Sequence, residues 1–397
     1  MAIRRAAIVV PGLVTSGGVP AVAAFLYQVM VNSGKYQPHL FSLSTSSRDK
    51  HSLRLLKPGS WFQGPTIGQG IWNGQPYQHV GAIWTEIEFQ RYQPRRLLTK
   101  ALSGFDLVQV VAGSPAWAYV TRDLQQPVFL QVATLAAVER QAILREISGT
   151  RRVWLKAMTK KVSQIEERAL GHLSAVFVEN TWMFEHLRKK MDPSRVIFAP
   201  PGVDLECFRS GKYQANSYIL SVGRLRDPRK NVPLLFKAYS RLLKELPTAP
   251  KLVLVGKSVP HDSTWQLAKS LGIARQIKVL RDVSTAELAD IYRKASLFVL
   301  SSDEEGLGIV ILEAMASSIP VVATRCGGPE TAVVDSHTGY LVPTGDAEAL
   351  ALRMQHLLEN PDEAERFGQA GRKKAEEEFS LETAGRGFLQ QYDKAFL

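Results

Sequence analysis

The chain has 397 residues, 45% of them hydrophobic and 22% charged, as in an ordinary globular protein. No apolar run reaches the ~18 residues that a membrane span needs, and two cysteines, Cys207 and Cys326, make neither a disulfide framework nor a zinc site. The net charge of +12 favours anionic partners such as nucleotide phosphates, nucleic acid or anionic lipid, or else serves solubility alone.

The first half of the chain alternates short apolar runs with amphipathic stretches, a pattern typical of parallel strands covered by helices on both faces. A strand is expected at Ala6–Val10, followed by a tight loop at Thr15–Gly18 and a helix from Pro20 to about Asn32. Further strands are expected at His39–Leu43, Leu107–Val111, Val128–Val132, Ala175–Val178 and Val196–Ala199. Residues 44–80 are rich in Ser, Gly, Pro and Gln without a clear period, so we interpret them as loops.

The second half of the chain is more regular. Buried strands are expected at Tyr218–Val222, Lys251–Val255, Gln276–Leu280, Leu297–Leu300 and Pro320–Ala323. Helices are expected at Val232–Glu245, Thr285–Lys294, Ile309–Ala316, Ala347–Glu359 and Glu363–Glu378. Prolines and glycines in Pro200–Tyr213 separate the two halves. We therefore predict an α/β protein with an N-terminal domain, residues 1–205, and a second domain, residues 206–380.

The sharpest motif is the stretch Glu305–Glu313, in which seven residues separate two carboxylates. Gly306 and Gly308 stand where a loop turns into a helix, whose free backbone N–H groups and positive dipole end suit a phosphate. Both carboxylates would then reach a ligand lying over the helix start. The spacing alone also fits a plain amphipathic helix with Glu305 as an N-terminal charge and Glu313 in solvent.

A second motif, Gly223-Arg224-Leu225 followed by Lys230, begins at the end of a predicted strand. Arg224 and Lys230 would project from a strand–helix loop, at the edge where open α/β sheets bind ligands. Two cations there could hold a diphosphate and neutralise it as a leaving group. The alternative is a basic surface loop, because Arg226 and Arg229 lie in the same segment.

Two glycine pairs also follow predicted strands. Gly17 and Gly18 would let the backbone approach a phosphate closely, although they lack the dinucleotide-binding fingerprint and also fit a structural turn. Gly327 and Gly328, followed by Pro329 and Glu330, are interpreted as a loop that opens a helix.

Taken together, these motifs resemble the donor half of glycosyltransferase family 4, which has the GT-B fold. The resemblance is carried by Gly223-Arg224-Leu225, Lys230-Asn231, Leu254-Val255-Gly256, Glu305-Gly306-Leu307-Gly308, Leu312-Glu313-Ala314-Met315-Ala316, Pro320-Val321-Val322-Ala323, Gly327-Gly328-Pro329-Glu330 and Gly339-Tyr340-Leu341-Val342. Pro201-Gly202-Val203-Asp204 resembles the interdomain segment, with Pro201 where Asn is usual. The resemblance implies two Rossmann-like domains facing across a cleft, with a C-terminal helix within residues 381–397 crossing back to the N-terminal domain.

The resemblance also implies roles for single residues. Glu305 would contact the donor hexose near its reacting face, and Glu313 would hold the ribose hydroxyls. Arg224 and Lys230 would bind the diphosphate.

Further donor contacts implied by the resemblance come mostly from the backbone. Amides of Leu307 and Gly308 would face the sugar, and those of Ile309 and Val310 the phosphates. Val283 corresponds to a position that contacts the base, and Gly17-Gly18 would approach the phosphate from the N-terminal domain.

We therefore predict a retaining, metal-independent hexosyltransferase that uses a UDP- or GDP-sugar as substrate and needs no cofactor. No Asp-x-Asp triplet of the metal-using type occurs. The acceptor would be a glycan, a lipid-linked sugar or a small metabolite. Nucleic acid is not expected as a partner, because no aromatic platform is interleaved with basic residues.

One departure from the family keeps two alternatives open. Many relatives carry a histidine after an N-domain strand, whereas Phe129–Thr134 contains none. A noncatalytic nucleotide-sugar-binding protein would fit this loss. A GT-B epimerase that acts on the nucleotide sugar itself, without an acceptor, is the other alternative.

Residues 145–161 combine six cations with Trp154, Leu155 and Met158, against the single acid Glu146. A basic amphipathic helix can lie on anionic lipid, so we predict contact with a membrane surface here. The alternative is a solvated helix whose apolar side packs on its own domain. The expected location is cytoplasmic, at the inner face of the membrane if this contact forms.

Overall fold

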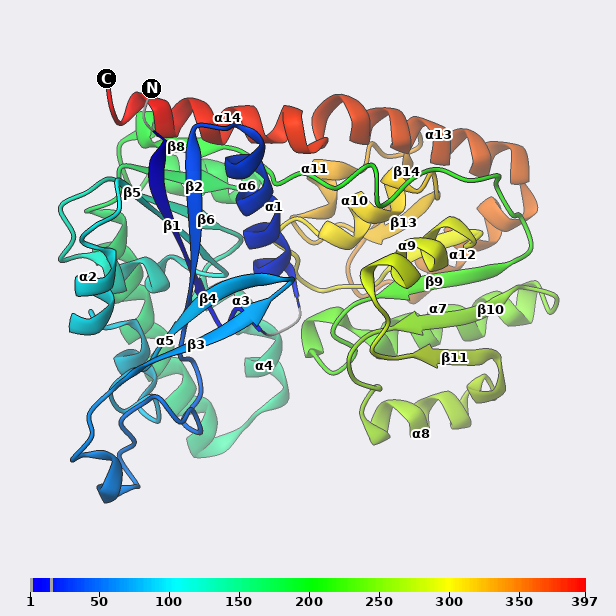
Figure 1. The fold of residues 1–397 in the computed structure, drawn as a ribbon. Coiled ribbons are helices and arrows are strands. Elements are labelled where there is room, and N and C mark those ends of the chain that lie inside the picture. Colours follow the sequence, from blue (N-terminus) through cyan, green and yellow to red (C-terminus); the bar gives the residue numbers. More distant parts are fainter. Residues whose placement is uncertain (1–2, 15–16) are drawn as a thin grey trace. The chain divides into compact units, whose positions relative to one another are not determined.

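The computed structural model describes residues 3–14 and 17–397, apart from the side chain of Glu146. Thr15 and Ser16, part of the predicted tight loop, lie outside the described residues. The chain divides into two compact units (Figure 1). Unit 1 comprises Met1–Pro200 and Gly385–Leu397, and unit 2 comprises Pro201–Ala384.

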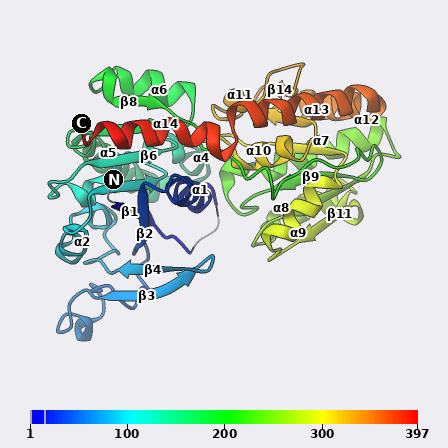
Figure 2. The ribbon, with the colours of Figure 1, turned by 45° about the horizontal axis from the view of Figure 1, so that its top comes forward.

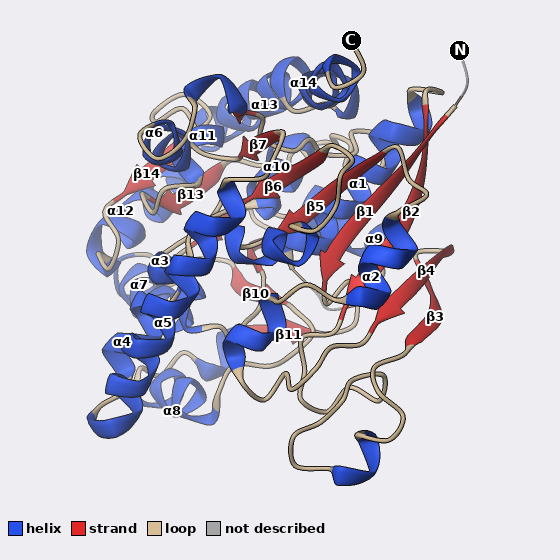
Figure 3. Cartoon of the chain, turned by 90° about the vertical axis from the view of Figure 1, so that its left-hand side faces the viewer, coloured by secondary structure: helices blue, strands red, loops and turns tan. Residues whose placement is uncertain are grey.

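The described part of unit 1 contains a sheet with the strand order β3-β4-β2-β1-β5-β6-β7-β8. The strands are β1 (Arg4–Pro11), β2 (Tyr36–Leu43), β3 (Ile67–Trp72), β4 (Gln75–Val80), β5 (Leu107–Ala112), β6 (Val128–Val132), β7 (Ala175–Val178) and β8 (Val196–Phe198). All neighbours are parallel except β3 and β4, and the central strands lie side by side in Figure 3. Every residue of β5, β6 and β7 is buried, as expected for strands covered on both faces.

Helices cover this sheet. They are α1 (Gly18–Asn32), α2 (Arg96–Leu102), α3 (Ala136–Glu139), α4 (Gln141–Glu146), α5 (Gly149–Leu170) and α6 (Thr181–Arg188), with short 3₁₀ helices η1 (Pro58–Ser60), η2 (Glu88–Tyr92), η3 (Pro115–Thr121) and η4 (Pro193–Arg195). One side of the sheet packs on α5 and η3 through a core that includes Val108, Leu130, Val162 and Ile165.

The interpretation of residues 44–80 as loops is wrong for residues 67–80, which form the antiparallel hairpin of β3 and β4. Its two-residue turn is Asn73-Gly74, with φ of 49° and 75°. Positive φ at both turn positions matches the twist of the strands, and Asn-Gly is the sequence that favours it. The Asn-Gly dipeptide was the available signal for the hairpin. The other signal, alternation of apolar and polar residues, is weak here because the hairpin lies at an exposed edge of the sheet.

Unit 2, in which every residue is described, holds an entirely parallel six-stranded sheet of order β11-β10-β9-β12-β13-β14. The strands are β9 (Tyr218–Val222), β10 (Lys251–Val255), β11 (Ile277–Leu280), β12 (Leu297–Leu300), β13 (Val321–Thr324) and β14 (Gly339–Val342). The helices are α7 (Val232–Glu245), α8 (Asp262–Ser270), α9 (Thr285–Arg293), α10 (Ile309–Ala316), α11 (Pro329–Ala332), α12 (Ala347–Glu359) and α13 (Pro361–Glu378), with η5 (Pro228–Lys230) and η6 (Ala274–Gln276). Separate hydrophobic cores on the two sides of the sheet hold these helices in place.

The last helix, α14 (Leu381–Lys394), packs on unit 1 beside α1 (Figure 2). Phe388 and Tyr392 are completely buried there, and the Tyr392 hydroxyl donates to Gln109 Oε1 at 2.7 Å. Lys35 Nζ lies 2.6 Å from Asp393 Oδ2. The predicted fold class, with two Rossmann-like units and a C-terminal helix that returns to the first, is confirmed.

Candidate functional site

Most of the predicted site residues of unit 2 lie on the loops that follow β9 and β12 or on α10, the helix that follows the second of these loops. These strands are hydrogen-bonded neighbours and run parallel, so their carboxyl ends meet at one edge of the sheet. The loops are tied together by their backbones: the Asp303 N–H donates to the Arg229 carbonyl at 2.7 Å, and the Ser301 hydroxyl donates to the Lys230 carbonyl at 2.9 Å. Asn231, at φ +43°, caps α7 and donates to Asp303 at 2.9 Å.

This arrangement brings Lys230 and Glu305 into a direct ion pair. Their side chains are only 16% and 10% exposed, so water screens the pair weakly. The Ser302 hydroxyl donates to the same Glu305 oxygen at 2.6 Å. Ser302 was not singled out from the sequence, because nothing in its spacing from Glu305 distinguishes it from the adjacent Ser301.

A second set of ion pairs lies one residue earlier on each loop. Arg229 contacts Asp227 at 2.8 Å and Glu304 at 3.0 Å, and its side chain is only 12% exposed. Arg224 pairs with the same Asp227 at 2.9 Å but remains 46% exposed. Arg224 therefore reaches the cluster through Asp227, while Lys230 contacts Glu305 directly. Arg229 is a bridge between the loops, which differs from the solvated basic loop considered above.

The start of α10 lies directly after Glu305. Gly308 occupies the N-cap position at φ +84°, and it offers no side-chain cap to the helix. The first N–H groups of a helix have no intrahelical acceptor, so those of Ile309 and Val310 can turn toward an anion. The Leu307 side chain is buried in the core at 1% exposure, which leaves its backbone as the part able to meet a ligand.

Gly328 holds the Glu305 loop against the neighbouring loop. A Cβ atom at Gly328 would lie 2.8 Å from the Glu305 carbonyl oxygen and 2.8 Å from backbone atoms of Leu307. Glu305 and Gly327 also form a parallel β-bridge. Pro329 begins α11 at its first turn, as the sequence pattern predicts.

Glu313 lies on the second turn of α10, where the Tyr292 hydroxyl donates to its Oε2 at 2.8 Å. Burial of the carboxyl raises the pKa of Glu313 to about 7, although the bond from Tyr292 acts in the opposite direction. The residue is thus partly buried and hydrogen-bonded, whereas a plain amphipathic helix would leave it in solvent. Tyr292, 21 residues earlier on the neighbouring α9, could not be linked to Glu313 from the sequence.

The other predicted residues lie elsewhere. Val283 follows Asp282, which has φ +54°, and packs partly buried against the core of unit 2. Gly17 precedes α1 in unit 1 with φ +133°. A Cβ at Gly18 would meet no atom within 4 Å, so its backbone is open on that side.

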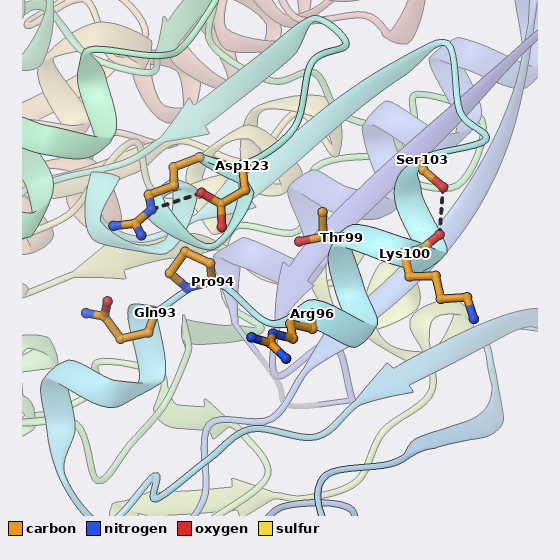
Figure 4. Close-up of a pocket in the computed structure, with 8 residues that line it drawn as sticks. Gln93, Pro94, Arg96, Thr99, Lys100, Ser103 and Asp123 are labelled. Carbon is orange, nitrogen blue, oxygen red and sulfur yellow. Dashed lines mark hydrogen bonds and ion pairs between the residues drawn. The ribbon is translucent and has the colours of Figure 1, made fainter.

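A pocket opens on unit 1 beside α2 (Figure 4). Its lining is Gln93, Pro94, Arg96, Thr99, Lys100, Ser103, Arg122 and Asp123, which includes none of the predicted site residues. Arg122 Nε donates to Asp123 at 3.1 Å, so one of the cations that line the pocket is already paired.

Within residues 3–14 and 17–397 we find no cluster of three or more His, Cys, Asp or Glu able to hold a metal. Over the same residues, no helix is long and apolar enough to cross a membrane.

In comparison with known protein families, the match lies within unit 2. Residues 204–374 match the family model "Glycosyl transferases group 1". A D-inositol 3-phosphate glycosyltransferase from Kineococcus radiotolerans is 34% identical over 212 residues, which is 47% of this chain and 48% of the relative. An MMP alpha-(1->4)-mannosyltransferase from Mycolicibacterium hassiacum is 32% identical over 206 residues, which is 52% of this chain and 50% of the relative. The chain thus spans about half the length of the curated relatives it matches.

Solved structures match over nearly the whole chain. Sucrose-phosphate synthase from Thermosynechococcus elongatus has a TM-score of 0.75 and 20% identity, covering 99% of both chains. Anabaena HepE in complex with UDP-glucose has a TM-score of 0.72 and 14% identity, covering 98% of this chain and 100% of that one. The fold therefore defines a GT-B protein. The second unit, over residues 204–374, matches the glycosyl transferases group 1 family, and the predicted resemblance of this half to glycosyltransferase family 4 is confirmed.

Proposed function

We propose that the protein is a retaining, metal-independent glycosyltransferase that moves a hexose from a UDP- or GDP-sugar to a glycan, lipid-linked or small-molecule acceptor. The observation that carries this proposal is the Lys230–Glu305 pair, held beside the uncapped start of α10 at the carboxyl edge of a parallel sheet. The activities named for the two curated relatives, a glycosyltransferase and a mannosyltransferase, support the same reaction class.

The leaving group would be stabilised by Lys230, Arg224 and the N–H groups of Ile309 and Val310. As the glycosidic bond breaks, negative charge builds on the β-phosphate of the donor. Cations and amides fixed around that phosphate stabilise the transition state more than the ground state. Lys230 would supply the positive charge that a divalent metal supplies in metal-using enzymes.

The two glutamates would have separate tasks. Glu305 would face the hexose, together with the amides of Leu307 and Gly308. Glu313 would accept hydrogen bonds from the ribose hydroxyls through Oε1, because Oε2 already accepts from Tyr292. Val283 would contact the base, and Gly17-Gly18 of unit 1 would approach the phosphate.

This role for Glu313 makes nucleotide binding dependent on pH. Its pKa is about 7 without ligand, and hydroxyl donors favour the ionised carboxylate over the protonated form. Affinity for the nucleoside diphosphate should therefore rise between pH 6 and 8, being roughly tenfold weaker at pH 6, where about a tenth of the carboxyl is ionised. Calorimetric titration of the diphosphate at each pH measures this. Titration of the diphosphate itself affects its binding to the Glu313→Gln variant and to the unmodified protein alike. If affinity changes equally with pH in the two proteins, Glu313 does not have this role.

The function itself is tested by incubating the protein with UDP- and GDP-hexoses, with and without a panel of acceptors, and measuring release of the diphosphate. We expect acceptor-dependent release that continues in excess chelator. HepE is bound to UDP-glucose, so UDP-glucose is the first donor to try. Conversion of the donor without acceptor would indicate an epimerase, and donor binding without turnover a noncatalytic protein. Activity abolished by chelator would exclude the metal-independent mechanism.

A further inference from the structure

Helix α5 of unit 1 has two unlike halves. Its second half is anchored in the core, where Val162, Ile165, Ala169 and Leu170 are buried. In its first half Val153 is 69% exposed and Trp154 is 55% exposed. In the first half Leu155 and Met158 are partly buried, so packing on the domain accounts for these two side chains but not for Val153 and Trp154.

The first half of α5 is also strongly basic. Residues 149–161 contain five cations and no acid, and all five cations are exposed: Arg151, Arg152, Lys156, Lys160 and Lys161. Within the described side chains, none of the five takes part in an ion pair. Their charge is therefore available to an external anion.

A second segment of unit 1, the loop around η1, has the same character. Leu56 is 84% exposed, Trp61 50% and Phe62 94%. Lys57 lies among them and is exposed, whereas Arg54 is partly buried and faces Glu86 at 4.0 Å; residues 50–85 contain no Asp or Glu. Exposed apolar side chains next to an exposed lysine are typical of surfaces that meet anionic lipid.

The η1 loop is held in this shape by its own hydrogen bonds. The Trp61 indole N–H donates to the Arg54 carbonyl at 2.8 Å, and the Ser60 hydroxyl donates to the Lys57 carbonyl at 2.7 Å. The Arg54 N–H donates to Ser60 Oγ at 2.9 Å. These bonds satisfy polar groups inside the loop, while Leu56 and Phe62 remain outside.

Both segments lie at the same end of unit 1. In Figure 1 the η1 loop and the start of α5 are at the lower end of the unit, and they remain at the lower end in Figure 3. The two views share the vertical axis and so give the same height, and Figure 3 adds that the two segments lie apart from one another in the horizontal direction.

We propose that the first half of α5 and the η1 loop form one docking surface for an anionic lipid bilayer. The aromatic and aliphatic side chains would enter the headgroup region, and the cations would contact lipid phosphates. A nucleic acid could pair with the cations, but it would offer no apolar partner to the exposed side chains of Leu56 and Val153. A second copy of the chain that pairs through this same surface would bring cations against cations, since neither segment offers acids in return.

Binding of the full chain to vesicles tests this surface and requires neither donor nor turnover. We expect co-sedimentation with phosphatidylcholine vesicles that contain phosphatidylglycerol, weakened at physiological salt, and little with phosphatidylcholine alone. The triple variant Arg152→Gln, Lys156→Gln, Lys160→Gln should lose roughly tenfold or more in affinity. Its matched control is Arg241→Gln, Lys244→Gln, Lys269→Gln, which removes the same charge from exposed positions of unit 2.

The apolar component is tested separately. Phe62→Ser with Trp154→Ser should weaken binding even at low salt, whereas Val334→Ser with Leu352→Ser, two exposed positions of unit 2, should not. Thermal midpoints of all variants check that they fold. The proposal is overturned if the unmodified protein ignores anionic vesicles at either salt, or if the control variants lose as much binding as the test variants. Tighter binding to a single-stranded oligonucleotide than to the vesicles would assign the surface to nucleic acid instead.

Discussion

Replacing Lys230 with alanine is expected to lower kcat/KM by about 10²-fold or more. Lys230 is the cation that the fold places in direct contact with Glu305, at the start of α10. Its loss removes a charge that would act most strongly when the β-phosphate becomes the leaving group. The scale is that of a lost oxyanion donor, about 2–4 kcal/mol in the barrier.

Steady-state kinetics with saturating acceptor measures this loss, and Lys244→Ala, at an exposed position near the end of α7, is the control. Lys230→Ala also removes the ion pair of Glu305 and leaves the Ser302 hydroxyl as the side-chain partner of that carboxylate. The thermal midpoints of the variant and the unmodified protein must therefore be compared, to separate a loss of stability from a loss of catalysis. Lys230→Arg keeps the charge and should recover part of the rate. A kcat/KM for Lys230→Ala within threefold of the unmodified protein would remove Lys230 from the mechanism.

Glu305→Gln and Glu313→Ala are expected to fail in different ways. Glu305→Gln should lower turnover by about 10²-fold while leaving affinity for the free diphosphate unchanged or somewhat higher, because it releases Lys230 from its ion pair. Glu313→Ala should weaken both the diphosphate and the intact donor, because the ribose is common to the two.

Calorimetric titration of both ligands into each variant separates these roles, with Glu359→Gln on the exposed end of α12 as control. Glu313→Ala leaves the buried Tyr292 hydroxyl without its carboxylate, so Glu313→Gln serves as a second, less disruptive variant. Equal weakening of the diphosphate by Glu305→Gln and Glu313→Ala would show that the assigned division is wrong.

Most of the regular elements of unit 2 were predictable because their signals are local, although the helix Asp262–Ser270 and the strand Gly339–Val342 were not among those expected. The strand Lys251–Val255 and the helix Val232–Glu245 have the bounds expected from an apolar run and from a 3.6-residue period. The hairpin of β3 and β4 was missed because half of its residues face solvent, so the run of apolar residues that marks a buried strand is absent.

Partnerships within the candidate site were not predictable from the same signals. Tyr292 meets Glu313, and Arg229 meets Glu304, across sequence separations of 21 and 75 residues. Such contacts depend on which strands are neighbours in the sheet, and periodicity carries no information on strand order. The order β10-β9-β12 places the loops together, and from sequence it was accessible only through the family resemblance.

The placement of α14 has a consequence for how the protein is made. Unit 1 needs Phe388 and Tyr392 to complete its interior, yet these residues are synthesised after the whole of Pro201–Ala384. Unit 2 is continuous in sequence and can fold as soon as it leaves the ribosome, because domains generally fold as units. The N-terminal unit, although translated first, is therefore expected to finish folding last, and until then its nascent sheet exposes the apolar surface that α14 will cover.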